Sequence, residues 1–148
     1  MLTQILDAKR KLTDTELANA ERQLGATLPT EYKDFLLAHN GGYPDPGSFS
    51  FDDGKEEGHI SWFLAIHDGE ISNLLLTAEI IKGRIPKDML AIAYDDFGNW
   101  ILLGMSGPRL GKIFFWDHDQ EEANAGADLE APMRFIADSL DALLKSLR

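Results

Sequence analysis

Residues whose side chains are able to act on a substrate or hold a metal occur in three places in the sequence. The first is Gly104-Met105-Ser106-Gly107-Pro108, which is similar to the G-x-S-x-G turn that exposes a nucleophilic serine between a strand and a helix. Here Pro108 replaces the last glycine, and the segment joins two expected strands. A turn that uses glycine for positive φ and proline for rigidity explains these residues, so we do not nominate Ser106 as a nucleophile.

Histidines and clustered acids form the other two groups. The four histidines lack the H-E-x-x-H spacing and have no cysteine partners, because the chain contains no cysteine. They are His39, His59, His67 and His118. The acids that follow Asp117 have calcium-like spacing, but an EF-hand requires glycine where Glu122 stands and glutamate where Asp128 stands. We therefore expect no metal, no cofactor and no catalytic residue, and we predict that the protein is not an enzyme.

The composition is that of a folded protein with one hydrophobic core. The chain has 148 residues, of which 44% are hydrophobic and 26% are charged. Its apolar runs fall short of the roughly 18 residues that cross a bilayer, and its N-terminus lacks the order of a signal peptide. Since disulfides are also excluded, we expect a single domain over residues 1–148, a cytoplasmic location and no membrane association.

The net charge of −11 is unevenly distributed along the chain. Fifteen of the 25 acids fall in the stretches 45–70, 95–96 and 117–130, which contain only one base, Lys55. These stretches carry −14, and the remainder carries +3. Such a field repels nucleic acid and anionic membranes and attracts basic partners. The alternative is that the acids serve only to keep the protein soluble.

Secondary-structure signals alternate between helical and extended patterns. Thr13 and Glu16 have the spacing of a capping box ahead of an apolar helix face. Continuous apolar runs at 100–103 and 113–116 are typical of strands covered on both faces. In chain order we expect helices at 13–24 and 29–39, strands at 49–51 and 60–66, a helix at 74–81, strands at 89–94, 100–103 and 112–116, and a terminal amphipathic helix entered at Pro132. This order predicts an α+β fold, with a largely antiparallel sheet wrapped by helices.

One segment, from Leu28 to Gly42, combines a helix start, an apolar helix face and a glycine stop. Its defining positions are Leu28, Pro29, Tyr32, Phe35, Leu36, Asn40, Gly41 and Gly42. With the later hydrophobic hairpin and the closing helix, this segment resembles the SUKH superfamily, which includes fungal cell-wall-assembly regulators and bacterial immunity proteins. The resemblance implies the same α+β fold. It also implies a binding role without catalysis, either neutralising a polymorphic toxin, often a nuclease, or regulating an endogenous partner.

Of these two roles, we favour the immunity protein, because an acidic surface is able to occupy the cationic groove with which a nuclease holds phosphates. Trp116 stands between a strand and acids, and we expect its ring to be half exposed as an aromatic anchor. The candidate contacts are Asp95, Asp96, Trp116, Asp117, Asp119, Glu121 and Glu122, with Asp52, Asp53, Glu56 and Glu57 as a second patch. A less favoured alternative is an enzyme or small-ligand binder that uses a groove beside Trp116.

Overall fold

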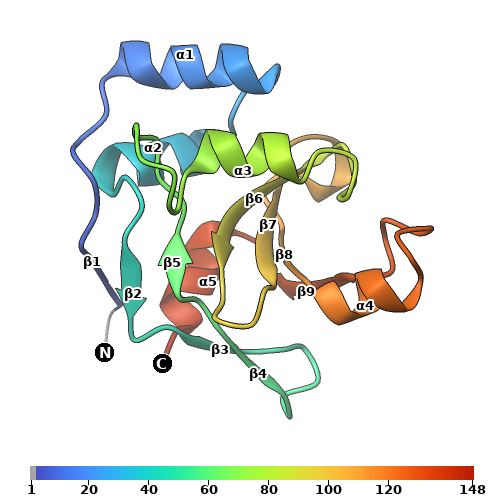
Figure 1. Cartoon of the computed structure of the whole chain (residues 1–148). Coiled ribbons are helices and arrows are strands. Elements are labelled where there is room, and N and C mark those ends of the chain that lie inside the picture. Colours follow the sequence, from blue (N-terminus) through green and yellow to red (C-terminus); the bar gives the residue numbers. More distant parts are fainter. Residues whose placement is uncertain (1–2) are drawn as a thin grey trace.

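The computed structural model describes residues 3–148, and its centre is a five-stranded antiparallel sheet (Figure 1). The strands are ordered β5-β6-β7-β8-β9 across this sheet. Their bounds are β5 (Trp62–Phe63), β6 (Met89–Tyr94), β7 (Trp100–Gly104), β8 (Ile113–Trp116) and β9 (Met133–Ala137). Two short antiparallel pairs accompany the sheet: β1 (Gln4–Leu6) with β2 (Tyr43–Asp45), and β3 (Ser48–Ser50) with β4 (Glu57–His59).

Helices pack around the sheet. Their bounds are α1 (Asp14–Leu24), α2 (Thr30–Ala38), α3 (Leu74–Ile80), α4 (His118–Ala123) and α5 (Leu140–Ser146). α3 packs on β6 and α5 packs on β9, while α1 contacts α3 from the outer side (Figure 1). Ile101, Leu102 and Leu103 of β7 are buried, as their continuous apolar run predicts. The expected α+β fold with a largely antiparallel sheet is confirmed.

The first two helices begin and end close to the predicted residues. The Thr13 hydroxyl accepts a hydrogen bond from the Glu16 amide (3.1 Å), and the Glu16 carboxylate accepts one from the Thr13 amide (3.0 Å). This reciprocal pair is the capping box that the sequence predicts, and Gly25 ends α1 in the left-handed conformation (φ 68°). Pro29 stands immediately before α2, where its missing N–H leaves no helical hydrogen bond unmade.

Asn40 and Gly41 explain why the segment after α2 has its sequence. The buried Asn40 side chain donates to the Arg10 and Ile66 carbonyls (3.0 and 2.9 Å) and accepts from the Ile66 amide (2.8 Å). It thereby joins the N-terminal segment to the chain that leaves β5. Gly41 has φ 75°, and a Cβ at this position would lie 2.6 Å from the Cβ of Ala65. Only glycine allows this close approach in that conformation.

The prediction for the C-terminus is wrong in its first half. Residues 133–137 form β9, and α5 begins only after Ser139, whose hydroxyl accepts from the Ala142 amide (3.0 Å). Phe135 continues the apolar spacing of the helix in the sequence, but in the fold it pairs with Phe114 of β8. Strand pairing satisfies the backbone groups of both strands, whereas β8 without β9 would be an open edge.

Two smaller predictions are also wrong. The strand expected at 60–66 is limited to Trp62–Phe63, although Leu64 still donates its amide to the Ile92 carbonyl (2.8 Å). The acidic segment after β8, to which we assigned neither helix nor strand from the sequence, contains α4. Asp117 starts this helix, because its carboxylate accepts from the Asp119 amide (2.9 Å).

Candidate functional site

One end of the five-stranded sheet collects parts of the three acidic stretches. Pairing in the sheet aligns Trp62 with Tyr94, Tyr94 with Trp100, Trp100 with Trp116 and Trp116 with Met133, in one row across all five strands. The β3–β4 hairpin enters at this row, the β6–β7 turn joins two of its strands, and α4 follows it. We call this the acidic end, and define it as residues 51–59, 95–99 and 117–122.

The β6–β7 turn is fixed by a buried carboxylate. Asp95 is only 7% exposed, and its Oδ1 accepts from the amides of Phe97 and Asn99, both at 2.9 Å. Its Oδ2 accepts from the Asn99 side-chain amide (2.9 Å). Asp95 therefore shapes the turn from within and is not available to a partner, whereas the exposed Asp96 accepts from the Ser61 hydroxyl (2.6 Å).

A second set of hydrogen bonds joins this turn to α4. The Asn99 side-chain oxygen accepts from the His118 amide (3.0 Å), and a Cβ placed on Gly98 would lie 3.2 Å from the His118 ring. Asp119, next in the chain, is exposed, with a carboxylate oxygen 3.3 Å from His118 Nδ1. The acids of the turn and of the first turn of α4 are thus held beside one another.

The β3–β4 hairpin is attached to the same end through Arg134 of β9. The Arg134 guanidinium donates to Asp53 Oδ2 and Glu56 Oε2, both at 2.9 Å, and lies 4.0 Å from the centre of the Phe51 ring. The Asp53 carboxylate also accepts from the amides of Glu56 and Lys55, and these hydrogen bonds, followed by Arg134, lower its pKa. The hairpin is therefore held with part of its charge already neutralised.

The eleven residues nominated from the sequence differ in what they offer a partner. Arginines neutralise four of the carboxylates: Asp53 and Glu56 through Arg134, Glu57 through Arg148, and Glu121 through Arg84. Within residues 3–148, five others pair with no lysine or arginine. They are Asp52, Asp96, Asp117, Asp119 and Glu122.

Trp116 is not the half-exposed anchor that the sequence suggests. Its exposed fraction is 0%, because β8 is paired on both sides and Arg84 lies over the ring, 5.5 Å from its centre. Arg84 also donates twice to Glu121 (2.9 and 3.0 Å), which holds the guanidinium in place. Trp116 therefore offers no exposed ring face to a small ligand.

Phe97 is the aromatic residue that the acidic end exposes. It lies in the β6–β7 turn with 74% of its surface exposed, next to Asp96. The sequence contains a signal for it, since a phenylalanine inside the turn Asp95-Asp96-Phe97-Gly98-Asn99 has no strand or helix face on which to be buried. Our interpretation of the sequence gave the anchor to Trp116 and missed Phe97.

A comparison with protein-family models decides the classification. The model described as the SMI1 / KNR4 family (SUKH-1) matches residues 11–146. The chain belongs to the SMI1/KNR4 family. This confirms the resemblance to the SUKH superfamily, and the match includes the whole Leu28 to Gly42 segment.

Individual relatives of this SMI1/KNR4 protein are distant. The SPbeta prophage-derived uncharacterized protein YokK of Bacillus subtilis (strain 168) is 26% identical over 127 residues, which cover 72% of this chain. The chain spans 62% of the length of that relative. A crystal structure of a protein from Pseudomonas syringae pv. tomato aligns with a TM-score of 0.49 and 15% identity, over 77% of this chain and 74% of that one.

No group of three or more histidines and acids is arranged around a common metal position within residues 3–148. In the same range, no helix has the length and apolar character needed to cross a bilayer.

Proposed function

We propose that this SMI1/KNR4 protein is a non-catalytic binding module that neutralises a cognate toxin, with its acidic end seated in a basic groove of that toxin. The observation that carries the proposal is that parts of three acidic stretches, far apart in the sequence, lie at the same end of the sheet. Scattered acids would raise solubility equally well, but would not match a concave basic surface.

Rigidity of the acidic end supports this role. Asp95 and Asn99 fix the turn, Asp117 starts α4, and Arg134 holds the hairpin, so the backbone that carries the exposed carboxylates loses little conformational freedom on binding. A nuclease displays positive charge to hold phosphates, and an array of carboxylates on such a backbone is able to imitate that polyanion and accelerate association. Phe97 supplies the apolar contact that such an interface needs at its centre.

The test is affinity capture with two charge-matched variants. The first neutralises the acidic end by Asp52→Asn, Asp119→Asn and Glu122→Gln. The control removes the same number and types of acid elsewhere, by Asp14→Asn, Asp34→Asn and Glu70→Gln, all on exposed residues outside the acidic end. We expect wild type and control to retain a stoichiometric basic toxin domain that high salt releases, and the first variant to lose it.

Co-expression gives the functional readout of the same proposal. Cells that produce the captured toxin domain should survive with wild type or with the control, and should die with the acidic-end variant. Capture of an endogenous regulatory partner that remains bound to the acidic-end variant would contradict the proposal. That result would favour a scaffold role of the cell-wall-regulator type.

A further inference from the structure

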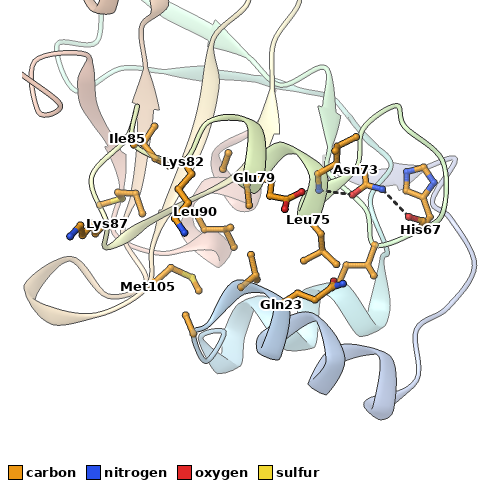
Figure 2. A pocket seen from close by; sticks show the side chains of 18 of the residues that line it. Gln23, His67, Asn73, Leu75, Glu79, Lys82, Ile85, Lys87, Leu90 and Met105 are labelled. Atoms are coloured by element: carbon orange, nitrogen blue, oxygen red, sulfur yellow. Dashed lines mark hydrogen bonds between the residues drawn. The ribbon is translucent and has the colours of Figure 1, made fainter. Parts of the chain in front are cut away.

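A groove on the outer side of α3 has no role in the acidic end. It has a volume of about 760 Å³ and lies between α1, α3 and the start of β6 (Figure 2). Its apolar lining comes from all three elements, from the segments that precede α3 and β6, and from the residue that follows β7. It includes Leu24, Leu75, Ala78, Leu90 and Met105.

α3 lines this groove with one face. Leu75, Ala78 and Glu79 of α3 follow the i, i+3, i+4 spacing of a single helix face and border the groove, as does Lys82 in the turn that follows the helix. Leu76 also borders the groove, and Ile80, one turn further along the helix, is exposed and apolar as well. Together with Ile71 just before the helix, these are three of the five large hydrophobic residues that the described chain exposes. Apolar surface gathered in this way is typical of a contact site for another protein.

Charge along the groove is polarised. Lys82 and Lys87 lie toward one end of it, and His67 and Asn73 lie toward the other (Figure 2). Within residues 3–148, neither lysine pairs with a carboxylate, even though the protein carries a net charge of −11. Glu79 borders the middle of the groove (Figure 2) and Asp68 also lines it, while Arg10 and Glu16 neutralise each other.

This pattern selects the occupant. We propose that the groove between α1 and α3 binds a peptide segment whose apolar side chains face Leu75, Ala78 and Leu90 and whose acidic end faces Lys82 and Lys87. The lysines attract carboxylates at one end only, whereas Glu79 and Asp68 repel a segment that is acidic throughout. The groove is bordered by polar side chains such as Gln23, which suits a peptide backbone.

This inference is independent of the proposed function, because the groove and the acidic end share no residue. It predicts a second binding surface that prefers an acidic partner, whereas the acidic end prefers a basic one. A toxin domain on the acidic end and a peptide in the groove are therefore able to bind at the same time.

A random dodecamer peptide library displayed on phage is the probe, selected against the immobilised full chain. Expected is an enriched set of peptides with apolar residues followed or preceded by two or more Asp or Glu at one end. Lys82→Glu with Lys87→Glu should weaken a selected peptide by about tenfold or more, because attraction becomes repulsion. The control, Lys9→Glu with Lys55→Glu, has the same charge change on exposed residues outside the groove and should bind as wild type does.

Further variants keep the outcome decisive. Ala78→Leu fills the groove without changing its charge and should also weaken the selected peptide, while the acidic-end variant Asp52→Asn, Asp119→Asn, Glu122→Gln should bind it normally. The proposal is wrong if no peptide is enriched, or if enriched peptides are basic and insensitive to both lysines. It is also wrong if 1-anilinonaphthalene-8-sulfonate, an apolar anion, binds with lysine dependence while no peptide does, since the groove would then be a small-ligand pocket.

Discussion

The Asn99 side chain accepts a hydrogen bond from the His118 amide at 3.0 Å, and this contact joins the β6–β7 turn to the first residue of α4. The same side chain donates to Asp95, the carboxylate that shapes the turn from within. Two segments that are nineteen residues apart in the sequence are thereby held as one unit. The acidic end depends on this unit for its shape, and the contact is accessible to mutation.

Asn99→Ala should lower the free energy of unfolding by about 1–3 kcal/mol, because it leaves the His118 amide and Asp95 each without one hydrogen-bond partner. Urea denaturation measures this loss. In the same turn, Asp96→Asn keeps an oxygen that accepts from Ser61, and should cost much less. Equal losses in the two variants would contradict the role assigned to Asn99.

Phe97→Ala should leave the free energy of unfolding within about 0.5 kcal/mol of wild type, because the side chain is 74% exposed. Its effect should fall on the captured toxin domain, whose affinity is expected to drop by about 2 kcal/mol, or roughly thirtyfold. Leu110→Ala removes a comparable exposed apolar side chain from the connection between β7 and β8, and should change neither quantity. Isothermal titration calorimetry with the purified toxin domain compares the variants. An unchanged affinity in Phe97→Ala would show that Phe97 does not contribute to the interface.

Arg134→Gln tests what lowers the pKa of Asp53. The backbone amides of Glu56 and Lys55 are the largest causes and Arg134 a smaller one, so the pKa should rise in this variant but stay below its ordinary value. Carboxyl carbon NMR during a pH titration reports the change directly. Arg148→Gln, which removes the partner of Glu57 in the same hairpin, should leave Asp53 as in wild type. A full return of the Asp53 pKa to its ordinary value would instead show that the ion pair with Arg134 is the main cause of the lowered pKa.

The Asp88–Arg109 pair predicts a pH-dependent contribution to stability. Arg109 donates to both oxygens of Asp88 (2.9 and 2.7 Å) and lowers its pKa. A lowered carboxyl pKa stabilises the fold above the unfolded value of about 3.9, and that stabilisation is lost as the pH falls through the folded value. Arg109→Gln should therefore cost about 1–2 kcal/mol at pH 7, and this difference should shrink below pH of about 4.

Urea titrations of wild type and Arg109→Gln between neutral and acidic pH give the comparison. Asp88→Asn removes the negative charge of the same ion pair and should show the same convergence with wild type at low pH. A difference that stays constant with pH would assign the loss to packing, because Arg109 also lies 5.7 Å from the centre of the Phe114 ring.

Local signals in the sequence predicted the elements that depend on local physics. The capping box at Thr13 and the left-handed stop at Gly25 need only neighbouring residues, and both are present. The meander from β6 to β8 followed from apolar runs separated by glycine turns. Residues 133–137 were misassigned because their apolar spacing fits a helix as well as a strand, and the deciding factor, the open edge of β8, lies outside the segment.

The sequence predicted that the candidate site is acidic, but not which of its residues are exposed and free of ion pairs. Clustering of the acids at one end depends on sheet register, which places residues as distant as Trp62 and Met133 in the same row. The burial of Trp116 depends on β9 and on Arg84, neither of which is adjacent to it in sequence. Pairing with Arg134 and Arg84, which neutralises several acids, is likewise invisible before the chain is folded.

Gly41→Ala should be among the most damaging single substitutions in the described chain. Its Cβ would lie 2.6 Å from the Ala65 Cβ and 3.2 Å from the Phe63 carbonyl oxygen, at a φ of 75°. The left-handed conformation and the overlap together should cost about 2–4 kcal/mol. Gly25→Ala separates the two causes, because Gly25 has a similar φ of 68° but no atom within 4 Å of the new Cβ, so its cost should be only about 1 kcal/mol. Thermal and urea unfolding of both variants measure the difference, and equal costs would mean that backbone conformation alone, and not the approach to β5, requires glycine at the end of the family segment.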